Sequence, residues 1–208
     1  RATSQIGKSV EDKMNAITMN DPRQFQFDLP SNSISPAPLN EVIHRRAWAA
    51  ARQSTSPRDN AEIELIVIHA TAGSTTDGAV SVMAEGRASF HWAVPGPNEA
   101  EHGTFVWACA PETRAAWHVR NSCYHPEVCD GTRRLNHRSL GIEIVNTQRE
   151  EPFTEWQITA TAEIIRYARA KYPRLRHVVS HARLDPARRT DPGRYFPWAD
   201  LMERVLAD

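Results

Sequence analysis

The stretch "IELIVIH", residues 63–69, gives the clearest indication of the fold class. It is almost continuously apolar instead of alternating, which is typical of a strand covered on both faces. The stretches "LGIEIVN" (140–146) and "RHVVSH" (176–181) show the same pattern, and "SFHWAVP" (89–95) and "GTFVWACA" (103–110) predict two weaker strands. The sequence therefore predicts a buried sheet with helices packed against it.

Helical patterns lie between and after these strands. In "TEWQITATAEIIRYARAKYP" (154–173), Thr154 and Gln157 predict a capping box at the start of a helix. One apolar stripe at helical spacing follows, made of Ile158, Ala162, Ile165 and Ala168. A short helix is predicted at "AVSVMAE" (79–85) and a last one at "WADLMERVLAD" (198–208). Strands and helices alternate, which predicts an α/β fold, a central mixed β-sheet flanked by helices.

Composition limits the class of partner. The chain has 208 residues, enough for one domain, and 25 basic residues balance 25 acidic ones, so we expect no nucleic-acid partner. No apolar run has the length of a membrane span, and the opening "RATSQIGKSV" is not a signal peptide. Residues 1–40 end in the Ser/Pro-rich "LPSNSISPAP" and are predicted to form an arm or linker before a domain at 41–208.

The three cysteines suggest little chemistry. Cys109 lies in an apolar run and is interpreted as a buried small hydrophobic residue. Cys123 and Cys129 lie in one polar loop, where a local disulfide and two free thiols are both compatible with the spacing. A disulfide would indicate an oxidising compartment.

Polar residues where two buried strands end suggest a metal site. His69 ends the first strand, His181 ends the last, and Asp191 follows in "RRTDPG". Each alone is more often structural. Together, two imidazoles and a carboxylate form a three-ligand zinc set that leaves one coordination position open for water.

Hydrolysis at such a site needs a base and a positive charge. Glu143 interrupts an apolar strand, which is costly for a carboxylate unless it is paired or functional. Arg189, two residues before Asp191, is the nearest cation in sequence, and Arg188 is the competing choice. We expect Glu143 to act as a general base and Arg189 to stabilise an oxyanion.

Four segments in order resemble one enzyme family. "VIHATAG", "RAAWHVRN", "NHRSLGIEIVN" and "SHARLDPARRTDPGRYFPW" are similar to motifs of the zinc-dependent N-acetylmuramoyl-L-alanine amidases of type 2, whose fold is that of the peptidoglycan recognition proteins. The resemblance extends over about residues 42–200. It implies one zinc ion on His69, His181 and Asp191, with Glu143 as the catalytic glutamate.

Three positions depart from the family pattern. Arg189 stands where the family has Lys, and a guanidinium can stabilise an oxyanion but not donate a proton. Phe90 stands where some members have Tyr, which leaves Glu143 as the stronger candidate base. Ala49 replaces the usual Gly in the segment "VIHRRAWAA" (42–50).

Several further residues are candidates for substrate binding. His91 and Trp92 are predicted to line the cleft, with a buried core pair as an equal alternative, and Thr71 could hydrogen-bond substrate. Trp117 and His118 belong to a family motif near the substrate and are interpreted as groove-lining or supporting residues. Asn136 and Ser139 are expected to shape a turn. The remaining histidines are interpreted as surface or structural: His44, His102, His125, His137 and His177.

The resemblance implies hydrolysis of the amide between N-acetylmuramic acid and L-alanine, in peptidoglycan or in soluble muropeptides. The alternative is a recognition module that binds muropeptides without cutting them. The N-terminal arm and a Cys123–Cys129 disulfide would favour a periplasmic or secreted, wall-facing protein, while a cytoplasmic recycling role stays open. The sequence does not determine the oligomeric state.

Overall fold

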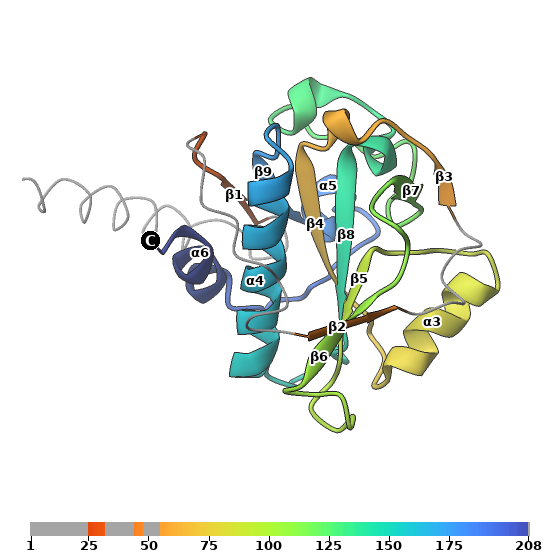
Figure 1. The fold of residues 1–208 in the computed structure, drawn as a ribbon, viewed down its shortest axis with the longest axis vertical. Coiled ribbons are helices and arrows are strands. Elements are labelled where there is room, and N and C mark those ends of the chain that lie inside the picture. The colour runs from red at the N-terminus through yellow and green to blue at the C-terminus, as the bar shows by residue number, and fades with distance from the viewer. Residues whose placement is uncertain (1–24, 32–43, 48–54, 208) are drawn as a thin grey trace, which may run out of the picture.

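The computed structural model describes residues 25–31, 44–47 and 55–207 (Figure 1). Within them, seven strands form one mixed sheet in the order β1–β9–β4–β8–β5–β6–β2, and β3 pairs with β7 in a small antiparallel sheet. The strands are β1 (Gln26–Asp28), β2 (His44–Ala47), β3 (Thr55–Pro57), β4 (Leu65–Ala70), β5 (Trp92–Val94), β6 (Phe105–Ala108), β7 (Arg114–Ala116), β8 (Ser139–Ile144) and β9 (His177–Ser180). The helices are α3 (Thr76–Ala84), α4 (Glu155–Lys171), α5 (His181–Leu184) and α6 (Trp198–Leu206), with short 3₁₀ turns η3 (Asn60–Glu62), η4 (Cys129–Gly131) and η5 (Leu135–Arg138).

The five predicted strands are confirmed and form the centre of the sheet. β9, β4, β8 and β5 run parallel, whereas β1 and β6 are antiparallel to their neighbours β9 and β5. This makes the sheet mixed, as the sequence predicts. Parallel strands place their carboxyl ends at the same edge, so residues that end β4 and β9 meet there.

Alternation along β4 and β8 gives the sheet two different faces. Ile66 and Ile68 pack with Ile142 in the large core beneath α4 and α6, which Figure 1 shows against one face of the sheet. Leu65 and Val67 point to the other side, into a smaller apolar cluster with the 119–135 segment and α5. We call these the helix face and the site face. Because side chains alternate, His69 follows Leu65 and Val67 onto the site face.

The helix predictions hold with one shift of boundary. The capping box of Thr154 and Gln157 is present at the start of α4, and the predicted apolar stripe of α4 is buried. The buried residues of α6 are Trp198, Leu201, Met202 and Val205. Helix α3 begins at Thr76, three residues earlier than predicted, because the Thr75 hydroxyl caps it by accepting from the Gly78 amide. No helix in the described part of the chain is long and apolar enough to cross a membrane.

Part of the predicted N-terminal arm belongs to the sheet. β1 pairs antiparallel with β9, and Phe25 and Phe27 are 5% exposed within the large core. Phe25, Phe27 and Leu29 alternate with Gln26 and Asp28, which is a short strand pattern inside a polar segment, and the pairing with β9 makes it part of the sheet. The rest of the arm and Ala49 lie outside the described residues.

The cysteines are free thiols. Cys109, Cys123 and Cys129 are all buried and unpaired with one another, so the disulfide alternative is wrong and the free-thiol alternative holds. Burial raises the pKa of the Cys129 thiol to about 12. Cys123 and Cys129 are buried although their loop is mostly polar in sequence, because both belong to an apolar cluster with Val128. One of the two sequence arguments for export is thereby removed.

Candidate functional site

Three predicted ligands meet at one edge of the sheet. His69 lies near the end of β4, His181 begins α5 directly after β9, and Asp191 lies in the following loop. The two Nδ1 atoms of the histidines are 3.0 Å apart, and Asp191 Oδ2 lies 3.0 Å from His69 Nδ1 and 3.1 Å from His181 Nδ1. All three residues are buried, and the backbone carbonyl of Asp191 accepts from the Ala182 amide, which ties the loop to α5.

The charges and spacing of this triad fit a metal ion. Burial lowers the pKa of His69 to about 4, so its imidazole is neutral. Burial alone would raise the pKa of Asp191, but hydrogen bonds from His181 and His69 hold it well below its ordinary value. Neutral imidazole and carboxylate are the forms that bind metals, and tetrahedral zinc ligands lie about 3.3 Å apart for bonds of about 2.0–2.1 Å. One metal ion at the centre of these three atoms would take the place of the protons that their hydrogen bonds share.

Glu143 lies beside the triad on the neighbouring strand. His69 of β4 and Glu143 of β8 are register partners, so both side chains stand on the site face. Burial raises the pKa of Glu143 well above its ordinary value, the Asp191 carboxylate adds to the rise, and Arg189 opposes it. A carboxyl with a raised pKa next to a candidate metal site is suited to proton transfer near neutral pH.

Two hollows border the triad. The first, of about 650 Å³, we call the cleft; it is lined by His69, Ala70, Thr71, Ala72, Gly73, Ser74, Thr75, Gly78, Ala79, Val82, Arg87, Ala88, Ser89, Phe90, His118, Glu143, Gln148, His181, Arg189 and Asp191. It contains the triad, the predicted base Glu143 and the predicted cation Arg189 together. The site face of the sheet forms its floor.

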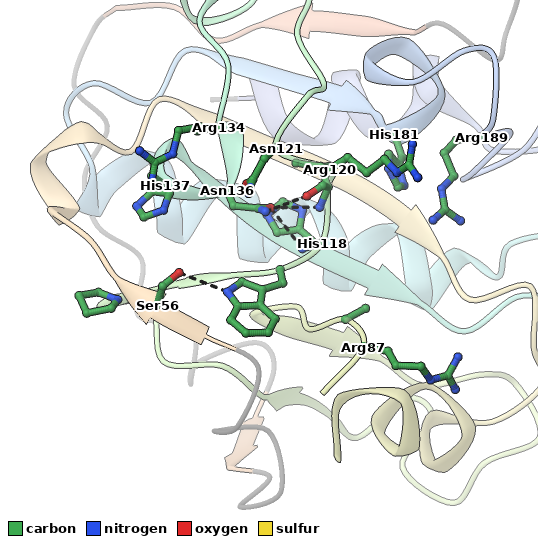
Figure 2. A pocket seen from close by; sticks show the side chains of 14 residues that line it. Ser56, Arg87, His118, Arg120, Asn121, Arg134, Asn136, His137, His181 and Arg189 are labelled. Carbon is green, nitrogen blue, oxygen red and sulfur yellow. Dashed lines mark hydrogen bonds between the residues drawn. The ribbon is translucent and has the colours of Figure 1, made fainter. Parts of the chain in front are cut away.

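The second hollow, of about 670 Å³, we call the groove. Its lining is Ser56, Pro57, Arg87, Ala88, Trp117, His118, Val119, Arg120, Asn121, Arg134, Asn136, His137, His181 and Arg189, with no acidic residue among the described ones. Figure 2 shows His181 and Arg189 at one end, Arg134 and His137 at the other, and His118 between them. The groove is therefore a basic extension of the cleft.

Trp117 and Thr71 lie at the hollows as predicted in sequence. Trp117 is 41% exposed in the groove, where its Nε1 donates to Ser56 Oγ at 3.2 Å. Thr71 lines the cleft, although its hydroxyl already donates to the Gly73 carbonyl at 2.8 Å. Trp117 thus offers the larger free surface.

His91 and Trp92 lie away from both hollows and are each 1% exposed, so neither can contact a substrate and the buried-pair alternative fits. Trp92 points to the helix face, where its ring meets that of Tyr167 edge-on at 6.0 Å. His91 Nδ1 accepts from the Gly141 amide at 3.0 Å, which holds the strand beside the site. The alternation of β5 puts these neighbours on opposite sides of the sheet.

Two functional candidates have no signal in the sequence. Gln148 lines the cleft, and its side-chain amide donates to the Ala70 carbonyl at 2.8 Å. Arg58 is half-buried. It is bonded to the Ser139 carbonyl and, at 3.1 Å, to His91 Nε2, and burial lowers its pKa to about 10. Neither residue belongs to a recognisable motif, since each acts through contacts with distant segments.

Comparisons with known proteins agree with this geometry. Residues 59–194 match the family model described as N-acetylmuramoyl-L-alanine amidase. The amidase AmiD of Escherichia coli is 32% identical over 164 residues, which cover 74% of this chain and 56% of AmiD. The 1,6-anhydro-N-acetylmuramyl-L-alanine amidase AmpD of Haemophilus influenzae is 30% identical over 92 residues, 43% of this chain and 47% of AmpD. The chain thus spans about half the length of these curated relatives.

Solved structures share the fold. AmiD of E. coli, in complex with the substrate anhydro-N-acetylmuramic acid-L-Ala-D-gamma-Glu-L-Lys, has a TM-score of 0.59 and 31% identity, covering 73% of this chain and 59% of that one. AmpDh3 from Pseudomonas aeruginosa has a TM-score of 0.60 and 27% identity, covering 69% and 59%. By its matched residues and its fold, the chain belongs to the N-acetylmuramoyl-L-alanine amidase family.

Proposed function

We propose that this protein is a zinc hydrolase that cuts the amide between the lactyl group of N-acetylmuramic acid and L-alanine. The observation that supports this most is the meeting of His69, His181 and Asp191 in one cleft with Glu143. Family membership supports the same reaction and substrate class. A module for recognition alone would not need a half-buried carboxyl with a raised pKa beside a complete ligand set.

The triad is proposed to hold one zinc ion through its two Nδ1 atoms and Asp191 Oδ2. A bound zinc ion supplies Lewis acidity, which polarises a carbonyl oxygen and lowers the pKa of water. Proton transfer and the stabilisation of negative charge are left to side chains of the protein.

Glu143 is proposed to accept a proton from the attacking water and to pass it to the leaving amine of L-alanine. Arg189 lines both hollows, so its guanidinium can stabilise negative charge on the former carbonyl oxygen. It does so as a fixed charge, because Arg stays protonated. Arg189→Lys should therefore retain most of the turnover, whereas Arg189→Gln should lose it, both measured as kcat on one muropeptide.

The two hollows suggest the orientation of the substrate. The stem peptide bears free carboxylates, whereas the muramoyl group loses its carboxylate charge in the amide. We propose that the peptide lies in the basic groove, near Arg134 and His137, and the muramoyl sugar in the cleft near Thr71. Trp117 offers its exposed ring to the substrate in the same groove.

The catalytic domain is proposed to comprise residues 41–208, with β1 added to its sheet. A periplasmic or secreted, wall-facing location is part of the proposal, and with the cysteines free it rests on the Ser/Pro-rich arm. A cytoplasmic recycling enzyme would instead prefer soluble anhydro-muropeptides to intact peptidoglycan.

Mass spectrometry of intact peptidoglycan and soluble muropeptides, incubated with the protein with and without chelator, tests the proposal. We expect peptides with a free L-alanine amino group, and none after chelation unless zinc is restored. Cleavage at another bond would contradict the assigned reaction, and cleavage that persists without metal would contradict the zinc. The faster substrate separates wall degradation from recycling.

A further inference from the structure

A line of buried hydrogen bonds leads away from the triad. His69 Nε2, the nitrogen that faces away from the other ligands, lies 3.0 Å from His118 Nδ1. His118 Nε2 in turn lies 2.9 Å from Ser139 Oγ. His69, His118 and Ser139 are 3%, 8% and 0% exposed, so solvent does not replace these partners.

The direction of this line follows from proton counting. When Nδ1 of a neutral His69 offers its lone pair to a metal, its one ring proton is on Nε2 and is donated to His118 Nδ1. His118 then has its own proton on Nε2 and donates it to Ser139 Oγ. Both ring N–H groups thus meet an acceptor, and both imidazoles are fixed in one tautomer.

The backbone of β8 leaves space for the His118 ring. A Cβ atom at Gly141 would come within 2.8 Å of His118 Cγ, so only glycine at this position of β8 lets the ring lie there. From the other side, Asn136 Oδ1 accepts from the backbone amides of His118 and Val119, at 3.2 and 3.0 Å. The ring is therefore held by groups that have no contact with the triad.

We propose that His118 is a positioning residue, which orients His69 and fixes its tautomer so that Nδ1 is available to the metal. This inference rests on the zinc-dependent function proposed above. His118 is interpreted in the sequence as groove-lining or supporting, and its bonds to His69 and Ser139 favour the second role. Loss of such an outer partner weakens metal binding by about 10–100-fold in known sites.

A matched set of variants tests the proposal. His118→Phe keeps a ring but removes the acceptor, His118→Gln keeps an acceptor and a donor, and His102→Phe makes the same change at a remote histidine that bonds to Thr154. The measurement is the zinc dissociation constant, by chelator competition on metal-free protein shown to be folded by circular dichroism. We expect about 10–100-fold weaker binding for His118→Phe, near wild-type binding for His118→Gln, and no change for His102→Phe.

A second readout needs no activity. In ¹H–¹⁵N spectra of the zinc-loaded protein, we expect the His69 Nε2 proton to exchange slowly with water in the wild type, where His118 accepts it, and faster in His118→Phe. Should that variant not fold, Ser139→Ala breaks only the second bond and should weaken zinc binding by a smaller factor. If the wild type binds zinc and either His118→Phe or Ser139→Ala binds it with the same affinity, the role of His118 is overturned while the zinc-dependent function stands. Absence of zinc binding by the wild type would overturn the zinc-dependent function as well.

Discussion

On the helix face of the sheet, β4 and β8 present isoleucine and leucine to α4 and α6, whereas on the site face the same two strands present His69, Ser139 and Glu143. The helix face forms a continuous apolar core. On the site face, polar groups are taken out of water, and each needs a partner to offset that cost. One strand pair therefore serves both stability and chemistry, because its alternate residues face different surroundings.

The largest effect is expected from the site face. Glu143→Gln removes the proposed proton acceptor at constant volume, and kcat should fall by about 10²–10⁴-fold. Steady-state hydrolysis of a muropeptide measures this, with the bound zinc counted in the same samples. Near wild-type turnover would remove Glu143 from the mechanism, and lost zinc would make it a ligand instead of a base.

Substitutions on the helix face should change the stability of the protein and leave its zinc affinity unchanged. Ile142 is fully buried beneath α4, so Ile142→Ala should lower the free energy of unfolding by about 2–5 kcal/mol, and Ile142→Val by about 0.5–1.5 kcal/mol. Urea unfolding gives these values. The zinc dissociation constant of the folded variant should equal that of the wild type. A parallel loss of zinc affinity would mean that the two faces are coupled.

The pH dependence of stability tests whether the Glu143 carboxyl on the site face destabilises the fold when it is ionised. Since burial raises the pKa of Glu143 in the folded protein, its contribution to stability is present below the unfolded pKa of about 4.3 and is lost as pH rises through the folded value. In chelated protein, Glu143→Gln should therefore become more stable relative to wild type as pH increases. Urea titrations at several pH values measure this, and a constant difference would show that the Glu143 carboxyl is not penalised by burial.

The smallest effect is expected in the groove. Arg134 is exposed there, so Arg134→Gln should raise KM for an anionic stem peptide only by about two- to five-fold and leave kcat unchanged. Arg133→Gln is the matched control, since Arg133 does not line the groove but stacks on Tyr124. If both variants change KM by the same factor, the charge of Arg134 in the groove does not contribute to binding of an anionic peptide.

Local patterns in the sequence predict much of this molecule. The apolar runs identify β4, β8 and β9, and the capping box fixes the start of α4. Polar residues at strand ends identify His69 and His181, and Asp191 lies in the polar loop that follows. The strand β7 is too short to leave a periodic pattern. The side of the sheet to which Trp92 points depends on register, which its own sequence does not contain.

Residue type and periodicity along single segments are enough to identify the α/β fold class, the family motifs and the candidate ligands. Only the folded chain shows that Cys123 and Cys129 stay free, and that His118 bonds to His69 and not to solvent. The reason is physical: burial and hydrogen-bond partners are set by segments distant in sequence, such as His118, which is 49 residues from His69. Only folding brings them within 3.0 Å.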